Sequence, residues 1–237
     1  MKNPPQTQTA RITEIFSSLQ GEGPRMGERQ IFVRFELCHM ACAYCDESSK
    51  RGRAMSIEDI LRKVDRLEKT DGPHACVSLT GGEPLLYADF LRSLARALKK
   101  KKFRILLETS GVLWRQLSKV AGHCDMIAMD LKLPSVTKQR DFLKDHQRFL
   151  QVAKKKDLYI KVVVSRSANV RELDRHLRMV ASLAPQTPVF LQPMSRQGKR
   201  YPDLGLMRYL GQLQRIGAKR LPDVRVGIQL HKVLNIS

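Results

Sequence analysis

Cys38-His39-Met40-Ala41-Cys42-Ala43-Tyr44-Cys45 is the stretch that most restricts the fold and the chemistry of this chain. It follows a β-branched run, Gln30 to Phe35, which reads as a strand, and it places three thiols within eight residues. Such crowding favours a metal centre over a secreted disulfide framework and indicates a reducing compartment. A four-iron cluster usually takes four cysteines, so this loop would leave one iron open to an external ligand.

Two simpler interpretations of the three thiols remain open. Structural zinc normally has four ligands, so a zinc site would have to recruit His39, Cys76 or Cys124. The three thiols could also be unrelated buried cysteines. We expect Cys76 and Cys124 to be core residues, because free cysteine behaves as a small hydrophobic residue.

Short β-branched runs alternate with longer helical patterns after an unpatterned head, which predicts βα units and a parallel sheet. Strands are expected at Gln30–Phe35, Cys76–Leu79, Arg104–Glu108, Met126–Met129, Leu158–Val164, Val189–Gln192 and Val224–Gln229. Helices are expected after a cap at Ser56-Ile-Glu-Asp59, and at Phe90–Leu98, Phe142–Val152, Leu173–Leu183 and Leu206–Ile216. The length of 237 residues fits one α/β domain, a partial (β/α)6-type TIM-like barrel that spans residues 1–237.

Unusual residues gather where the expected strands end. These segments are Thr80-Gly81-Gly82-Glu83-Pro84, Glu108-Thr-Ser-Gly111, Asp130-Leu-Lys132 and Gln192-Pro193. In a parallel barrel the loops beyond the carboxyl ends of the strands share one face. The four segments are therefore expected to converge on one pocket.

The chain is strongly basic, with 43 Lys and Arg against 23 Asp and Glu and a formal charge of +20. Such a charge attracts polyanions or an anionic substrate without choosing between them. The runs Lys99–Lys102 and Lys154–Lys156 fall where helices should end, where cations offset the helix dipole. No stacking platform of aromatics accompanies them, so direct nucleic-acid binding is not expected. No run approaches the eighteen or so apolar residues of a membrane span, and we expect a cytoplasmic protein.

The cysteine loop resembles the Cys-x3-Cys-x2-Cys signature of the radical S-adenosylmethionine (SAM) enzymes, with Tyr44 fitting as the aromatic before the last cysteine. The resemblance implies a 4Fe-4S cluster on Cys38, Cys42 and Cys45, with SAM chelating the open iron. Gly81-Gly82-Glu83-Pro84 matches a segment of that family whose backbone contacts the SAM amino group; by itself it would indicate only a tight turn. The SAM side would comprise Tyr44, Thr80, Gly81, Gly82, Glu83, Ser110, Asp130, Lys132 and Gln192.

Within that superfamily the chain resembles the 7-carboxy-7-deazaguanine synthase family nearly end to end. The head Glu14-Ile-Phe-Ser-Ser-Leu-Gln20-Gly21-Glu22-Gly-Pro24, the strand Ile31-Phe-Val-Arg34 and the ending Gly227-Ile-Gln-Leu-His231-Lys-Val-Leu-Asn-Ile-Ser237 carry the match. The resemblance implies Glu22, Arg34 and His231 as catalytic residues, and substrate contacts from Gln20, Gly21, Glu22, Arg34, Thr80, Gly82, His231 and Ser237. An amide and a carboxylate suit a guanine-like edge, and a planar guanidinium suits a substrate carboxylate.

The implied reaction converts 6-carboxy-5,6,7,8-tetrahydropterin to 7-carboxy-7-deazaguanine with loss of ammonia, in queuosine and 7-deazapurine biosynthesis. A 5'-deoxyadenosyl radical formed from SAM would start it. The implied partners are an electron donor, flavodoxin-like or another reductant, and a second copy of the chain in a homodimer.

Two positions depart from the family pattern. Glu47 stands where the family has a hydroxyl that coordinates magnesium. Two alternatives stay open: Glu47, a competent oxygen ligand, holds Mg²⁺ instead, or its longer anionic side chain alters or removes the site. Asp130-Leu-Lys132 resembles the activating enzymes of glycyl-radical enzymes, which gives a first alternative function. The second alternative, from another class, is a basic zinc-binding module on nucleic acid.

Overall fold

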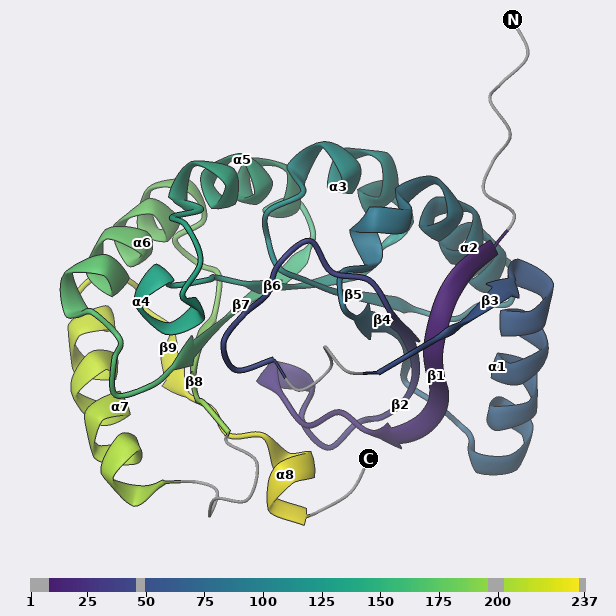
Figure 1. The fold of residues 1–237 in the computed structure, drawn as a ribbon, viewed down its shortest axis with the longest axis horizontal. Helices are drawn as coiled ribbons and strands as arrows, with labels where there is room; N and C mark the ends of the chain where they lie inside the picture. The colour runs from purple at the N-terminus through teal and green to yellow at the C-terminus, as the bar shows by residue number, and fades with distance from the viewer. Residues whose placement is uncertain (1–8, 46–49, 196–202, 235–237) are drawn as a thin grey trace, which may run out of the picture.

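The computed structural model describes residues 9–45, 50–195 and 203–234, and its described strands form one nine-stranded sheet (Figure 1). The strands are β1 (Thr9–Leu19), β2 (Arg29–Phe35), β3 (Arg53–Ser56), β4 (Cys76–Gly81), β5 (Ile105–Thr109), β6 (Met126–Asp130), β7 (Asp157–Val164), β8 (Val189–Pro193) and β9 (Val224–Val226). Their order in the sheet is β3-β1-β2-β4-β5-β6-β7-β8-β9. Neighbours from β2 to β9 are parallel, and β1 pairs antiparallel with both β2 and β3.

The helices are α1 (Ile57–Asp71), α2 (Ala88–Lys100), α3 (Trp114–Val120), α4 (Pro134–Thr137), α5 (Leu143–Ala153), α6 (Val170–Leu183), α7 (Leu204–Gly217) and α8 (Leu230–Leu234). All of these except the short α4 and α8 pack along the outer side of the curved sheet (Figure 1). The sheet does not close, because β3 and β9 are its two ends. The expected α/β fold of a partial TIM-like barrel is thus confirmed.

The first helix shows how local sequence sets an element boundary. Ser56 Oγ accepts a hydrogen bond from the Asp59 amide (3.1 Å), and Asp59 Oδ2 accepts one from the Ser56 amide (3.1 Å). This is the predicted capping box, which satisfies amides that the first helical turn leaves unpaired. The two basic runs also lie at helix ends: α2 ends at Lys100, and Lys154 caps α5.

A continuous apolar core fills the space between the sheet and the outer helices, with Phe35, Phe90 and Phe149 among its fully buried side chains. Cys76 and Cys124 are buried as expected, and burial raises the pKa of each thiol to about 12. No helix of the described part of the chain has the length and apolar character needed to cross a membrane.

A second, smaller cluster lies on the inner face of the sheet and consists of Cys76, Leu106, Met126, Ala128, Tyr159 and Phe190. Side chains two residues apart on a strand share a face. The residues that come two positions later on these strands, among them Glu108, Asp130 and Lys161, therefore sit directly beyond this apolar floor.

Two expectations about the chain ends were wrong. The head is not unpatterned, since residues 9–19 form the long strand β1. Its second half is half-buried on both faces, which removes the clean apolar alternation that marks a strand in sequence. The last strand ends at Val226 rather than Gln229, and residues 230–234 form α8.

Candidate active site

A chamber of about 530 Å³ opens at the carboxyl ends of the parallel strands, between the cysteine loop and the segments 18–22 and 229–232. All four strand-end segments contribute to it, which confirms the predicted convergence. Residues at these positions include Thr80, Gly81, Gly82, Glu108, Thr109, Ser110, Asp130, Lys132, Gln192 and Pro193. Chambers of this size accommodate small-molecule ligands and cofactors.

The cysteine loop forms one wall, and Cys38, Cys42 and Cys45 all line the chamber. Burial raises the pKa of the Cys38 and Cys42 thiols, and a bound metal would have to displace those protons. Within the described residues, no three His, Cys, Asp or Glu side chains converge as they would on a single ion. The ligands of a cube-shaped cluster bind different irons and need not meet at one point, so the loop fits a 4Fe-4S cluster.

The glycine pair of the Gly81-Gly82-Glu83-Pro84 turn lets this turn lie against the start of the cysteine loop. A Cβ on Gly81, whose φ is +117°, would lie 2.3 Å from the Phe35 carbonyl oxygen, and one on Gly82 would lie 2.2 Å from that of Leu37. The Gly82 and Glu83 amides donate to these two carbonyl oxygens (2.8 and 2.6 Å). Close backbone approach therefore explains both glycines.

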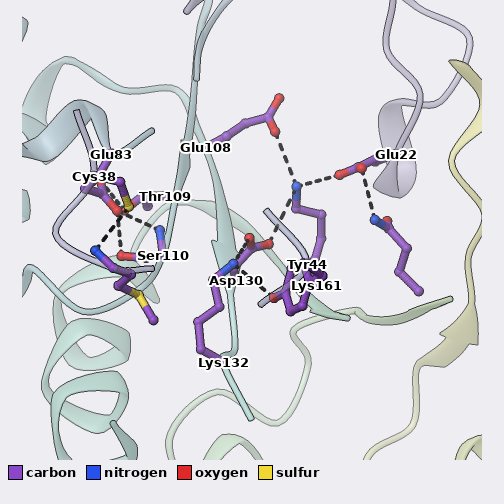
Figure 2. A network of polar contacts seen from close by, with 12 residues as sticks. Glu22, Cys38, Tyr44, Glu83, Glu108, Thr109, Ser110, Asp130, Lys132 and Lys161 are labelled. Carbon is purple, nitrogen blue, oxygen red and sulfur yellow. Dashed lines mark hydrogen bonds and ion pairs between the residues drawn. The ribbon is translucent and has the colours of Figure 1, made fainter. Parts of the chain in front are cut away.

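Glu83 lies behind the chamber wall and is fully buried. Its carboxylate accepts hydrogen bonds from Thr109 Oγ1 (2.8 Å), the Ser110 amide (2.8 Å) and Ser110 Oγ (2.5 Å). Figure 2 shows this group of contacts beside Cys38. The Glu83 side chain thus supports the end of β5 and does not line the chamber.

Lys132 joins the cysteine loop to the end of β6. Its Nζ donates to Asp130 Oδ2 (2.8 Å) and to the Tyr44 hydroxyl (3.4 Å), and it lies 5.6 Å from the centre of the Tyr44 ring. Burial alone would lower the pKa of Lys132, but Asp130 and Tyr44 outweigh it, so the lysine is charged. A fixed cation and aromatic ring thus stand next to the three thiols.

A buried ammonium group, Lys161 of β7, lies next to Asp130, which stands between Lys161 and Lys132 (Figure 2). Its Nζ donates to Glu22 Oε2 (2.6 Å) and Glu108 Oε2 (3.3 Å) and is 3.6 Å from Asp130 Oδ1. Burial would raise the pKa of Glu22, yet Lys161 and the neighbouring hydrogen bonds lower it to about 2. Glu22 is therefore a carboxylate over the whole physiological range.

Neither Lys161 nor Glu108 was predicted as a site residue, although Glu108 was placed in a converging segment. Glu108 Oε1 accepts from Ser78 Oγ (2.8 Å) and from Gln20 Nε2 (3.1 Å). The available signal for Lys161 was a lone lysine inside the apolar strand Leu-Tyr-Ile-Lys-Val-Val-Val. A charged residue in such a strand is rarely buried without a paired partner.

Glu22 also connects the segment after β1 with β8 and with the segment before α8. Its Oε1 accepts hydrogen bonds from Gln192 Nε2 (3.0 Å) and Gln229 Nε2 (2.8 Å). Next to it, the Leu230 amide donates to the Gly21 carbonyl oxygen (2.9 Å), and a Cβ on Gly21 would lie 2.1 Å from His231 Nδ1. The structure therefore brings Gln20, Gly21, Glu22 and His231 together, as the resemblance implied.

Arg34 lines the chamber mouth, where its guanidinium lies 5.3 Å from the centre of the Phe16 ring. Glu14 forms ion pairs with Arg34 Nε (3.1 Å) and Lys50 Nζ (2.9 Å). Glu14 and Lys50 line the same mouth and were not predicted as site residues. Two predicted residues, Glu47 and Ser237, lie outside the described residues.

Comparisons with known proteins agree with this geometry. The family model described as "Radical SAM superfamily" matches residues 32–183. The 7-carboxy-7-deazaguanine synthase of Geobacter sulfurreducens is 32% identical over 95% of this chain and 97% of its own length, and that of Methanocaldococcus jannaschii is 32% identical over 95% and 99%. The crystal structure of QueE from Escherichia coli superimposes with a TM-score of 0.68 at 25% identity, covering 95% of this chain and 96% of that one.

The two relatives and the solved structure match nearly the whole chain, and the family model includes the cysteine loop and the ends of strands β2 and β4 to β7. They support the first hypothesis over a zinc-binding module or a glycyl-radical activating enzyme. This chain belongs to the radical SAM superfamily and, within it, to the 7-carboxy-7-deazaguanine synthase family.

Proposed function

We propose that this protein converts 6-carboxy-5,6,7,8-tetrahydropterin to 7-carboxy-7-deazaguanine with loss of ammonia, a lyase reaction of queuosine and 7-deazapurine biosynthesis. The observation that carries the proposal is that one chamber holds two kinds of group. Three thiols and the neighbouring Lys132 line it, and so does the Glu22–Lys161–Glu108 cluster, with Asp130 in contact with both lysines. A radical source and a polar substrate site would thus lie next to each other within one cavity.

Cys38, Cys42 and Cys45 would hold the 4Fe-4S cluster, and Tyr44, Thr80, Gly81, Gly82, Glu83, Ser110, Asp130, Lys132 and Gln192 would hold SAM, with Glu83 acting through its backbone and through its support of Ser110. When bound, the cluster and SAM supply the one-electron chemistry that starts the reaction. The methionine part of SAM has a carboxylate, which needs a cation, and an amino group, which needs hydrogen-bond acceptors. Lys132 would supply the cation and Asp130 an acceptor, and the two side chains lie 2.8 Å apart.

Glu22 would bind the donor-rich edge of the pterin. A carboxylate has about four acceptor positions, and Lys161, Gln192 and Gln229 use three of those on Glu22. One position remains for a substrate N–H. Because these three donors already fix the orientation of the Glu22 carboxylate, the side chain loses little conformational entropy when the substrate binds.

Arg34 and His231 complete the substrate contacts in this proposal, together with Gln20, Gly21, Thr80, Gly82 and Ser237. Arg34 would pair with the substrate carboxylate at the chamber mouth, a role that suits a planar guanidinium. The segment 229–232 covers the substrate end, so the chain's own residues exclude water and hold the ring in place.

Four further features belong to the proposal: Mg²⁺ held with Glu47, a homodimer, a cytoplasmic location and a single domain over residues 1–237. One continuous sheet supports the single domain. Removal of Mg²⁺ with a chelator and its readdition would test the metal, and light scattering of the purified protein would test the dimer.

The decisive experiment is anaerobic turnover. Reconstituted protein, SAM, dithionite and 6-carboxytetrahydropterin should give 7-carboxy-7-deazaguanine by mass spectrometry, with no protein substrate added. Glu22→Ala should abolish turnover and keep the absorbance of the cluster. Glu28→Ala is the matched control, because Glu28 is a nearby carboxylate that does not line the chamber. Full activity of Glu22→Ala would refute the assignment of that residue, and absence of product from the loaded wild type would refute the function.

A further inference from the structure

A second cavity, of about 570 Å³, lies outside the chamber and next to the cysteine loop. We call it the groove, and its walls include His39, Trp114, Arg115, Gln139, Arg140 and Phe142. The other loop residues Cys38, Met40, Cys42, Tyr44 and Cys45 line the chamber instead. His39, which follows the first cysteine directly, thus places the loop between the two cavities.

The wall of the groove also anchors the loop. Gln139 Nε2 donates to the Ala41 carbonyl oxygen (3.0 Å), and the Ala43 amide donates to that of Thr137 (3.1 Å). A molecule seated in the groove would therefore touch both the loop and the segment that holds it. It would approach the cysteine loop from a cavity whose lining differs from that of the chamber for SAM and substrate.

Arginines lie over the aromatic rings of the groove: Arg115 and Arg140 belong to its lining, and Arg148 lies beside it, against Trp114. The Arg115 and Arg148 guanidinium carbons lie 4.5 and 5.6 Å from the centre of the Trp114 ring, and that of Arg140 lies 4.2 Å from the centre of the Phe142 ring. Arg140 also pairs with Asp145 (2.9 Å). Within the described residues, neither Arg115 nor Arg148 forms an ion pair with a carboxylate.

These properties are those of a protein-binding surface. Trp and Arg are enriched at the energetic centres of interfaces, and a flat guanidinium held on a ring presents its donors with little loss of entropy. Trp114 is the only tryptophan of the sequence, and it is half-buried at the mouth of this groove. A chain of net charge +20 would in addition steer an acidic partner toward such a surface.

We propose that the groove is the docking site for an acidic one-electron carrier protein that reduces the cluster. The inference rests on the proposed function, because this chain needs an electron carrier only if its cysteine loop holds the redox-active cluster. Electron transfer slows steeply with distance, so the carrier must bind beside the loop. The groove meets that condition and leaves the chamber open to SAM and substrate. A nucleic acid would also be attracted by arginines, but it would gain nothing from contact with the cysteine loop.

The test measures reduction of the cluster, without pterin, by a reduced acidic flavodoxin and separately by dithionite. The variant Arg115→Glu/Arg148→Glu should slow reduction by flavodoxin about 10- to 100-fold at low salt, the range of electrostatic steering. Reduction by dithionite, which needs no docking, should stay within twofold of wild type. The matched control is Arg66→Glu on α1, an exposed arginine on another helix, which should behave as wild type.

Each outcome decides the proposal. Unchanged reduction by flavodoxin in the double variant, or equal slowing in Arg66→Glu, would overturn it. So would salt-sensitive RNA binding that the double variant loses while its reduction by flavodoxin is unaffected, because the groove would then be a nucleic-acid site. Failure of the proposed function is a separate result, seen as wild-type protein without iron, or as reduced, iron-loaded protein that makes no product.

Discussion

Replacement of Lys161 by methionine tests the electrostatics of the substrate end most directly. Three carboxylates, those of Glu22, Glu108 and Asp130, lie within 3.6 Å of its ammonium group. Methionine keeps much of the volume and removes the charge. Lys132 still neutralises Asp130 in the variant. Glu22 and Glu108, however, lose their shared cation while remaining buried near each other.

The size of the effect follows from the pKa of Glu22, which is about 2 with Lys161 present against an ordinary 4.5. Without Lys161 the main cause of the lowering is lost, while burial and the nearby carboxylate still raise the pKa, so the pKa of Glu22 should rise. A return to the ordinary 4.5 corresponds, at about 1.4 kcal/mol for each tenfold change, to roughly 3 kcal/mol of lost stabilisation of the carboxylate. Because Lys161 also holds this carboxylate in place, we expect kcat/KM at pH 7 to fall by about 100-fold in Lys161→Met.

The pH dependence separates this effect from simple misfolding. In the wild type the lowered pKa of Glu22 stabilises the fold above pH 4.5, and that contribution is lost as the pH falls toward 2. In Lys161→Met the folded pKa should rise back toward the unfolded value, so this stabilisation above pH 4.5 is lost. The activity of the variant should rise with pH as Glu22 becomes ionised. The activity of the wild type should show no such rise over the same pH range, because its Glu22 is already ionised there.

The assay is kcat/KM for product formation between pH 5.5 and 9 with dithionite as reductant, with iron content and circular dichroism as controls for folding. Lys161→Arg keeps the cation and should retain the pH profile of the wild type with a smaller loss of rate. If Lys161→Met had near wild-type kcat/KM and an unshifted profile, the argument that this lysine keeps Glu22 ionised and in place would be refuted.

Three further variants probe the rest of the chamber. In Gly21→Ala the added Cβ meets the imidazole of His231 at 2.1 Å, so KM for the pterin should rise at least about 10-fold, whereas Gly122→Ala, where nothing lies within 4 Å, should not change it. Glu83→Gln weakens several buried charge-assisted hydrogen bonds and should cost about 2 kcal/mol, seen as a Tm lowered by roughly 4–8 °C; an unchanged Tm would contradict the supporting role. Cys38→Ala should lose most of the iron-dependent absorbance after reconstitution, and full iron content would reject this cysteine as a ligand.

Sequence patterns predicted the parallel strands because each is a compact apolar run bounded by turn residues. They also predicted the chamber, because the carboxyl ends of parallel strands must meet. They failed for β1, which borders the chamber with half of its length and therefore mixes Glu14 and Ser18 with apolar residues. Residues that act through distant partners were the hardest to predict: the role of Lys161 depends on Glu22, 139 positions away.

The open sheet explains why the substrate end depends on contacts between remote segments. A closed barrel would seal itself by pairing its first and last strands, but here β9 and β3 are both free ends within the described residues. The turn after β1 and the segment before α8 meet instead, through Gln229 and Glu22, which are 207 positions apart. Glu22 also accepts hydrogen bonds from Lys161 of β7 and Gln192 of β8. One carboxylate therefore connects the turn after β1 with β7, β8 and the segment before α8. Because no ladder of strand hydrogen bonds supports this junction, its geometry depends on a few side chains, and changes there should alter substrate binding before they alter the fold.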